Sequence, residues 1–262
     1  VPTQYFGESG IWRGSAVQLK PGRNYITTPK IGSLTDPRGG MYYLTYAGGK
    51  PEEIKLHIRD SEGVTRIPVL ELSGWYDMDE AKRKETIQTY VNELNAHCSA
   101  NSNLTQTSIQ NATEISTPSV LLSLPADSVK AGLGSDAVNT MYQNVLAWEE
   151  VLFVANKTQG IIDTDVNIAS YKYPMTTRQN IRYMRMFAGA FMYAAGNHIG
   201  IGYGSASGLV CGRPTSGGSA SLFGWGIAHE IGHNMDKLGK AEITNNIYSL
   251  AVQAWDGADM KK

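Results

Sequence analysis

Two histidines and a glutamate, in the order His229-Glu230-x-x-His233, are the residues of this chain best suited to chemistry. Residues four apart lie on one face of an α-helix, so both imidazoles can bind a single metal ion. Glu230 then projects beside that ion, where a carboxylate can take a proton from a water molecule held by the metal. The pattern predicts one Zn²⁺ per chain and hydrolysis of a peptide bond, with the metal-bound water as nucleophile and Glu230 as general base.

A catalytic zinc site needs more than these two histidines, because it normally takes three protein ligands and leaves one position for water. One class of zinc peptidase uses a histidine six residues after the motif, but that position is Gly239 here. Glu242 lies just past this glycine, and Asp236 lies one turn after His233 on the same predicted helix. Asp236 would crowd the histidines from their own face, so we favour Glu242 as the third ligand and keep Asp236 as the alternative.

Two predicted helices must position these side chains. The first is expected to begin near Ser221 and to end around residues 238–239, where glycine permits a left-handed stop. The second is expected to begin at Glu242, and its predicted apolar side consists of Ile243, Ile247, Leu250, Ala251 and Ala254. A polar stripe containing Asn246 lies beside that apolar side. The second helix could thus present Glu242 to zinc, with Asn246 holding a ligand side chain in place.

A further donor is needed to stabilise the oxyanion of the transition state, and removing such a donor typically costs about 3 kcal/mol. His198, Tyr203 and Tyr248 carry donor groups, and for each of them a structural role is the alternative. Residues 196–218 are rich in Gly and Ser and precede the motif helix. Such a stretch can line a substrate cleft or serve as a connector.

The rest of the chain predicts an α+β fold in two units. Residues 54–59 alternate apolar and polar side chains with the period of a half-buried strand, and residues 41–46 are rich in β-forming residues. We therefore expect an antiparallel, β-sandwich-like unit in residues 1–76. A mainly helical zinc-peptidase domain that contains the motif helix is expected in residues 77–262.

Within the second unit, helical spacing of apolar residues predicts helices after Asp77 and from about Asp136. The second of these helices carries Trp148 and Phe153, which are expected to pack in the core. Residues 101–117 are expected to be a loop, and residues 119–124 a short buried strand.

Composition excludes several other functions. The chain has 262 residues with 23 basic and 24 acidic side chains, a balance that argues against nucleic-acid binding. The most apolar run, residues 186–203, is rich in glycine and contains polar residues, so no membrane span is predicted. Cys98 and Cys211 could be paired or free. The chain begins at Val1 without an initiator methionine, and we expect it to be part of a larger polypeptide.

Two blocks of sequence carry a specific family resemblance. Residues 224–235 (GWGIAHEIGHNM) and residues 242–250 (EITNNIYSL) resemble the core of the M60-like (enhancin-like) metallopeptidases. In that family, HExxH is followed by a glutamate after a variable gap, which is eight residues here. The resemblance is strong over residues 222–252 and weaker in the preceding part of the chain.

This resemblance implies a gluzincin-type zinc endopeptidase in which His229, His233 and Glu242 bind the metal and Glu230 is the base. Members are secreted or surface-attached, frequently in bacteria, and many cleave mucin-like proteins next to an O-glycosylated Ser or Thr. The implied substrate is therefore a mucin-like, O-glycosylated protein, and Trp225 is a candidate sugar contact or equally a core residue. Two alternative functions remain. One is a glycan-binding or adhesion module with a vestigial zinc site, and the other is a zinc protease whose activity does not depend on glycans.

Overall fold

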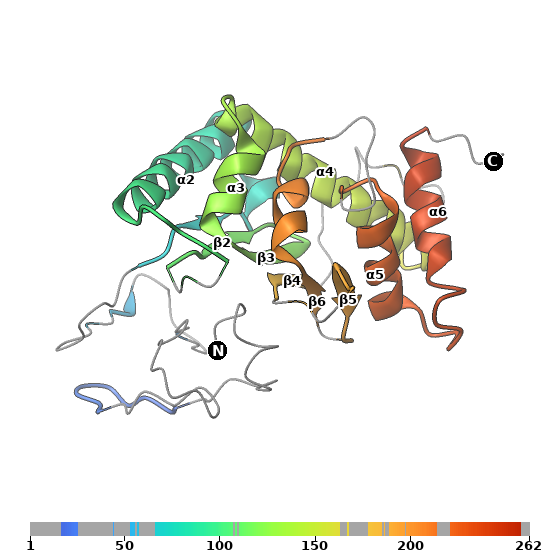
Figure 1. Ribbon diagram of the computed structural model, residues 1–262, viewed down its shortest axis with the longest axis horizontal. Coiled ribbons are helices and arrows are strands. Elements are labelled where there is room, and N and C mark those ends of the chain that lie inside the picture. Colours follow the sequence, from blue (N-terminus) through green and yellow to red (C-terminus); the bar gives the residue numbers. More distant parts are fainter. Residues whose placement is uncertain are drawn as a thin grey trace.

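The computed structural model places a six-stranded sheet and its helices after residue 68 (Figure 1). The residues that the structure describes are 17–25, 44, 53–55, 57, 66–106, 108, 110–162, 167, 178–184, 186, 189–196, 198–213 and 221–257. The β-sandwich-like unit expected in residues 1–76 lies mainly outside these residues. The division into units 1–76 and 77–262 therefore stays a prediction.

The sheet is mixed and has the strand order β1-β2-β3-β4-β6-β5. The pairs β2–β3 and β5–β6 are antiparallel, whereas the other neighbours are parallel. The strands are β1 (Val69–Glu71), β2 (Thr113–Ser116), β3 (Val120–Leu124), β4 (Gln179–Tyr183), β5 (Met192–Ala194) and β6 (Ile199–Ile201). Strand β5 thus forms one edge of the described sheet.

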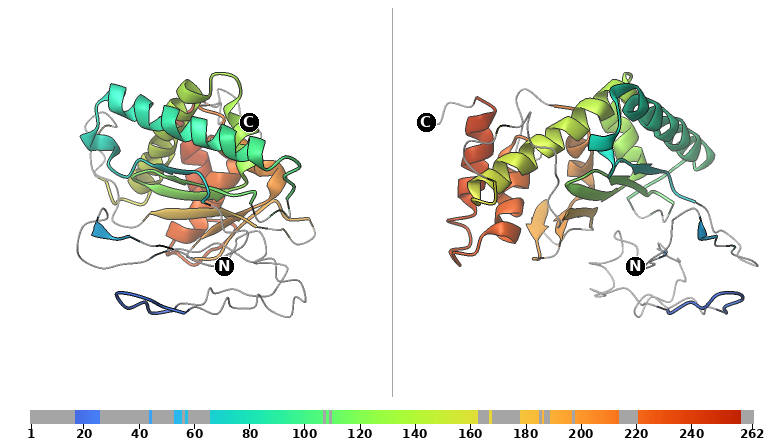
Figure 2. Two further views of the ribbon diagram at one scale, coloured as in Figure 1. Left: turned by 90° about the vertical axis from the view of Figure 1, so that its left-hand side faces the viewer. Right: turned by 180° about the vertical axis from the view of Figure 1, so that it is seen from behind.

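Helices α2, α3 and α4 lie together on one face of this sheet, and α5 and α6 form a pair beyond its β5 end (Figures 1 and 2). Helix α4 contacts α2 and α3 as well as α5 and α6, so it connects the two groups. The helices are η3 (Trp75–Asp77), α2 (Glu80–Ala100), α3 (Ala126–Leu133), α4 (Ala137–Thr158), η4 (Tyr203–Leu209), α5 (Trp225–Met235) and α6 (Asn246–Trp255).

Several predicted elements are confirmed. The apolar spacing after Asp77 corresponds to α2, which begins where the Asp79 carboxylate accepts a hydrogen bond from the Lys82 amide at 2.7 Å. The predicted buried strand is β3, and the helix expected from Asp136 is α4. Trp148 is fully buried on α4, and its indole N–H donates to the carbonyl oxygen of Leu209 at 3.0 Å. One continuous hydrophobic core joins the sheet to the helices.

Several elements were not predicted, among them β4, β5, and the strand β6 and helix η4 inside the Gly- and Ser-rich residues 196–218. Residues 113–116 form β2 instead of continuing a loop, because the neighbouring strands pair with this polar Thr-Glu-Ile-Ser segment on both sides. Helix α3, which directly follows Pro125, was not predicted at all. The described residues therefore form a mixed α/β fold with more sheet than the sequence indicated.

A buried carboxylate, Glu149 on α4, holds the turn between β2 and β3. It accepts hydrogen bonds from the hydroxyls of Tyr76 at 3.0 Å, Thr117 at 2.8 Å and Ser119 at 2.7 Å, and from the Ser119 amide at 3.1 Å. Burial raises the pKa of Glu149, whereas these donors lower it. We assign this residue a structural role, because all of its contacts tie α4 to the sheet and to η3.

Both cysteines have free thiols, half-buried at Cys98 and exposed at Cys211. Within the part of the chain that the structure describes, no helix has the length and apolar character needed to cross a membrane.

Candidate metal centre

Helix α5 carries the HExxH motif and is shorter than the sequence indicated. It begins at Trp225, after a turn in which the Gly224 amide donates to the carbonyl oxygen of Ser221 at 3.0 Å. It ends at Met235, because the backbone of Asp236 adopts an extended conformation. The Asp236 carboxylate accepts hydrogen bonds from the Leu238 amide and the Thr244 hydroxyl. Gly239 does adopt the predicted left-handed conformation, with φ 70°, but it lies in the loop beyond the helix.

Glu242 is not on a helix, contrary to the prediction. Helix α6 begins at Asn246, and Glu242 lies in the preceding turn with φ 64°. In this turn the amides of Ile243 and Thr244 donate to the carbonyl oxygen of Lys240 at 2.9 and 3.0 Å. The turn brings the glutamate carboxylate back over the end of α5.

The predicted apolar side of α6 faces solvent, which corrects the expected packing. Ile243, Ile247 and Leu250 are 68%, 48% and 41% exposed. The buried side chains of α6 are Tyr248, Ser249 and Val252 instead, and the Ser249 hydroxyl donates to the carbonyl oxygen of Trp225 on α5 at 2.9 Å.

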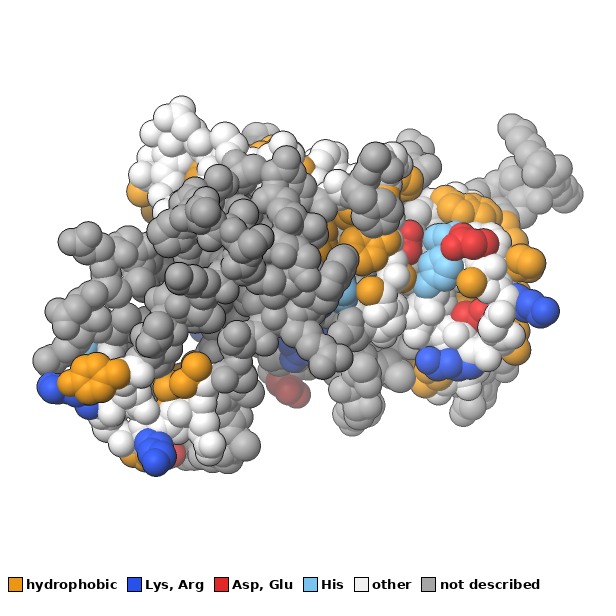
Figure 3. Space-filling model, turned by 60° about the horizontal axis from the view of Figure 1, so that its bottom comes forward, with side chains coloured by type: hydrophobic (Ala, Val, Ile, Leu, Met, Phe, Trp, Pro, Cys, Tyr) orange, Lys and Arg blue, Asp and Glu red, His pale blue; other side chains and the backbone are white. Residues whose placement is uncertain are grey.

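The structure brings His229, His233 and Glu242 together. The Nε2 atom of His229 lies 3.1 Å from Oε2 of Glu242, and that of His233 lies 3.0 Å from Oε1. The two Nε2 atoms are 3.2 Å apart. The Glu242 side chain is 70% exposed, so the cluster lies at the surface. Figure 3 shows histidine and acidic side chains side by side on this face, among hydrophobic ones.

These three donors fit a zinc ion. Four ligands in tetrahedral geometry, with bonds of roughly 2.0–2.1 Å, lie about 3.3 Å from one another. The observed separations of 3.0 to 3.2 Å are close to that value. Two imidazoles and one carboxylate also form a donor set of catalytic zinc sites. The alternative ligand, Asp236, is not part of the cluster, and its carboxylate bonds to Leu238 and Thr244 instead.

Asn246 orients one of the imidazoles. Its Nδ2 donates to the carbonyl oxygen of Glu242 at 2.8 Å, which leaves Oδ1 facing Nδ1 of His229 at 2.7 Å. An amide oxygen can only accept, so the proton of the His229 ring is on Nδ1. The lone pair of Nε2 then points into the cluster, which is the arrangement the sequence hypothesis gave Asn246.

Glu230 lies next to the cluster but is not one of its three donors. The residue is buried, and burial raises the pKa of its carboxyl group, while His229 lowers it and Glu242 raises it further. The backbone amide of Ala194 on β5 donates to this carboxylate. Glu230 thus connects the edge strand of the sheet to the cluster, and a raised pKa is suited to accepting a proton.

The remaining candidates bond elsewhere. The Tyr203 hydroxyl donates to Asp127 on α3, and the Tyr248 hydroxyl donates to Gln159 at the end of α4. His198 is buried, with Nε2 3.1 Å from the Tyr193 hydroxyl. Trp225 is half-buried at the first position of α5. The structure thus brings neither the two tyrosine hydroxyls nor the His198 ring into contact with the three donors.

His198 is expected to make stability depend on pH. Burial lowers its pKa to about 4 from an ordinary 6.5, so the unfolded chain binds the extra proton between these two pH values. The free energy of unfolding should therefore fall by up to about 3 kcal/mol as the pH drops from 6.5 to 4. Denaturant titrations of the wild type and His198→Gln at several pH values measure this fall.

In His198→Gln the dependence of stability on pH should be correspondingly weaker. His57→Gln is the matched control, because His57 is exposed and its replacement should leave the wild-type profile unchanged. Identical profiles for the wild type and His198→Gln would contradict the prediction.

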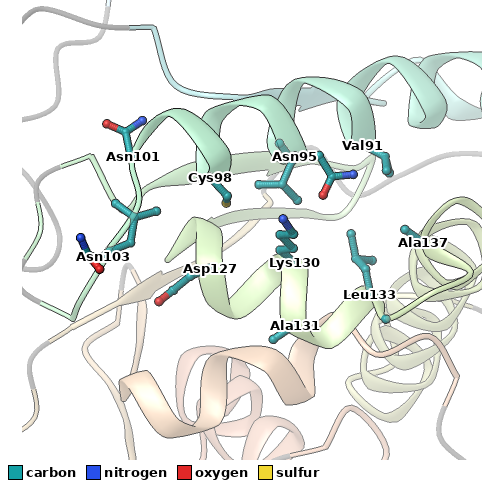
Figure 4. Close-up of a pocket in the computed structure, with 13 residues that line it drawn as sticks. Val91, Asn95, Cys98, Asn101, Asn103, Asp127, Lys130, Ala131, Leu133 and Ala137 are labelled. Atoms are coloured by element: carbon teal, nitrogen blue, oxygen red, sulfur yellow. The ribbon is translucent and has the colours of Figure 1, made fainter.

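A separate pocket of about 590 Å³ lies between α2 and α3 (Figure 4). Its lining includes Asn95 and Cys98 of α2 and Lys130 of α3. None of the three clustered donors lines it, so it is a different site from the candidate metal centre.

One contact of the cluster was not anticipated. The amide nitrogen of Asn245 lies 3.0 Å from Nε2 of His233. The sequence does contain a signal for this contact, the adjacent pair Asn245-Asn246 near the start of a predicted helix. The sequence hypothesis gave a role to Asn246 alone.

Comparisons with known proteins show one family and a shared fold. The family model described as "Peptidase M60, enhancin and enhancin-like" matches residues 101–259. No match was found among curated proteins. Among solved structures, the M60 catalytic domain of Clostridium perfringens ZmpC, in complex with the sialyl T antigen, is 24% identical, with a TM-score of 0.52 over 74% of this chain and 34% of that chain.

Two further structures are similar. The ZmpB metallopeptidase of Clostridium perfringens is 24% identical, with a TM-score of 0.50 over 74% of this chain and 34% of that chain. The catalytic module of the metalloprotease ZmpA of the same organism is 20% identical, with a TM-score of 0.51 over 75% of this chain and 35% of that chain. At this identity the likeness shows a shared fold. The chain spans about a third of the length of the structures that it matches.

Proposed function

The chain belongs to the family of peptidase M60, enhancin and enhancin-like proteins, and on that premise we propose that it is a zinc-dependent endopeptidase acting on mucin-like, O-glycosylated proteins. The observation that carries the proposal is the convergence of His229, His233 and Glu242, whose donor atoms lie 3.0 to 3.2 Å apart. Their type and spacing support one Zn²⁺ per chain.

Each residue of the site has a distinct part in this proposal. The two Nε2 atoms and the Glu242 carboxylate hold the metal, and Asn246 fixes the His229 ring by accepting from its Nδ1–H at 2.7 Å. When bound, zinc polarises a carbonyl group and lowers the pKa of a water molecule toward about 7. Glu230 accepts the proton of the attacking water and returns it to the leaving amine.

The glycoprotein substrate is supported by a single relative. The catalytic domain of ZmpC, similar in fold to this chain, has been solved in complex with the sialyl T antigen. The three similar proteins described above come from Clostridium perfringens, which supports a bacterial origin, and the family resemblance implies a protein that is secreted or surface-attached. Since the chain spans only about a third of the matched structures, we propose that it works as part of a larger polypeptide.

The test is cleavage of a synthetic peptide, prepared with and without one sialylated O-glycan on a threonine, followed by mass spectrometry. We expect fragments of the glycosylated peptide only, and none after treatment with a zinc chelator. Fragments from both peptides would favour the zinc protease that ignores glycans. Binding to mucin without fragments would favour the glycan-binding module, and chelator-resistant cleavage would exclude a metal-dependent mechanism.

A further inference from the structure

The loop between α5 and α6 carries Glu242, and burial of its side chains does not hold it in place. All residues from 237 to 243 are exposed, so none of them anchors the loop in the hydrophobic core. Two of them, Gly239 and Glu242, adopt left-handed backbone conformations with φ 70° and 64°. A residue with a side chain keeps such a conformation only when the surrounding contacts fix it. Contacts other than apolar packing must therefore hold Glu242.

Asp236 and Thr244 close this loop at its two ends. The Asp236 carboxylate accepts a hydrogen bond from the Thr244 hydroxyl at Oδ2, and one from the Leu238 amide at Oδ1, at 2.9 Å. The Thr244 hydroxyl also lies 3.2 Å from the carbonyl oxygen of Lys240. Because the hydroxyl has one proton and the charged carboxylate is the stronger acceptor, its bond goes to Asp236. We call this pair of residues the Asp236–Thr244 clamp.

The hydrogen bonds continue from the clamp to the turn that contains Glu242. The amides of Ile243 and Thr244 donate to the carbonyl oxygen of Lys240 at 2.9 and 3.0 Å. On the other side, Nδ2 of Asn246 donates to the carbonyl oxygen of Glu242 at 2.8 Å. Glu242 lies only two residues before Thr244, so a displacement of Thr244 would also displace the glutamate relative to α5.

The clamp uses no atom that the metal needs. The candidate ligand atoms are Nε2 of His229, Nε2 of His233 and the carboxylate oxygens of Glu242. The clamp consists of the Asp236 carboxylate and the Thr244 hydroxyl, which bond to each other and to the loop. These bonds can therefore persist when zinc occupies the three donors.

We propose that the Asp236–Thr244 clamp positions the third metal ligand, because it keeps the Glu242 carboxylate over the two imidazoles. The inference rests on the proposed zinc site and adds two positioning residues to it. Without the clamp, the exposed loop would adopt other conformations for part of the time. The apparent zinc affinity would then fall in proportion to the fraction of molecules in which Glu242 is in place.

The test replaces Thr244 by valine, which has nearly the same shape but no hydroxyl. Changes to residues that support metal ligands typically weaken metal affinity by about 10- to 100-fold. Since the clamp does not touch a ligand side chain, we expect the lower end, a loss of about 10-fold, measured by competition with a chromophoric chelator. Thr244→Ser keeps the hydroxyl and should bind zinc as the wild type does. The Tm of metal-free Thr244→Val should stay close to that of the wild type, because the loop is exposed.

Two further variants show whether the effect passes through the clamp and Glu242. In Asp236→Asn, the side-chain nitrogen can donate to the Thr244 oxygen, so this variant should lose less affinity than Thr244→Val. Adding Thr244→Val to Glu242→Ala should weaken zinc binding by much less than 10-fold, because the carboxylate that the clamp positions is gone.

Thr86→Val is the matched control. Thr86 is a half-buried residue of α2 whose hydroxyl donates to the carbonyl oxygen of Lys82 at 2.9 Å, on a different helix from the metal ligands. It should keep the wild-type zinc affinity. Wild-type affinity in Thr244→Val would overturn the proposal, as would an equal loss in Thr86→Val or an undiminished effect of Thr244→Val in the Glu242→Ala background. Failure of the wild-type chain to bind zinc would instead overturn the proposed function.

Discussion

Replacing Glu230 by glutamine is expected to lower kcat for the glycosylated peptide by about 10³-fold, within the 10²- to 10⁴-fold range typical of general acid–base catalysis. Glutamine has nearly the same shape and can still accept the hydrogen bond that the Ala194 amide gives to Glu230. It cannot accept a proton from water. Because Glu230 is not among the three clustered donors, the variant should still bind one zinc ion per chain.

Peptide kinetics and elemental analysis of the same preparation check both parts of this prediction. Glu85→Gln is the matched control, because Glu85 is an exposed residue of α2 whose carboxylate pairs with Lys82 at the surface. It should cleave the peptide at the wild-type rate. Undiminished turnover by Glu230→Gln would show that another group acts as the base.

Replacing Glu242 by alanine is expected to remove zinc almost completely. The change takes one of three protein donors from the site, so the affinity should fall by more than the 10- to 100-fold typical of residues that only support ligands. Glu242 is exposed and lies in a turn with φ 64°, a conformation that strains alanine about as much as glutamate. The Tm of the metal-free variant should therefore stay close to that of the wild type.

Asp236→Asn separates the two possible third ligands. The Asp236 carboxylate ends α5 and bonds to Leu238 and Thr244, so this variant should keep its zinc. Metal content measured after dialysis checks both variants. Zinc retained at one per chain in Glu242→Ala, together with its loss in Asp236→Asn, would make Asp236 the ligand.

The sequence predicted the clustered donors better than the elements that carry them. The helical spacing of His229 and His233 is a local property, and Glu242 is the first carboxylate after the glycine break. The end of α5 depends on a hydrogen bond between Asp236 and Thr244, eight residues apart in a loop. No periodic pattern reports such a bond, so the predicted helix was too long.

The orientation of α6 could not be predicted for a different reason. Amphipathic spacing suggests that the apolar residues face the protein, but here Ile243 and Ile247 are exposed. The buried face is selected by how closely α6 approaches Gly232 and by the bonds that Asn245 and Ser249 make to α5. These are contacts between two helices, which the pattern within one helix does not contain.

Strand β2 was missed because its stability comes from its neighbours. Thr113 and Glu114 are buried polar residues: the Thr113 hydroxyl hydrogen-bonds to the Tyr90 hydroxyl of α2, and the Glu114 carboxylate accepts a hydrogen bond from the Ser123 hydroxyl of β3. A polar segment of this kind resembles a loop until its distant partners are known. Buried apolar runs such as β3 give a local signal, and that strand was predicted correctly.

The most direct test of the central claim is anomalous diffraction, recorded on both sides of the zinc absorption edge, from crystals of the zinc-loaded chain. We expect one anomalous peak per chain, at about 2.0–2.1 Å from Nε2 of His229, Nε2 of His233 and a carboxylate oxygen of Glu242. A peak at another place, or a Glu242 carboxylate turned away from the metal, would contradict the account.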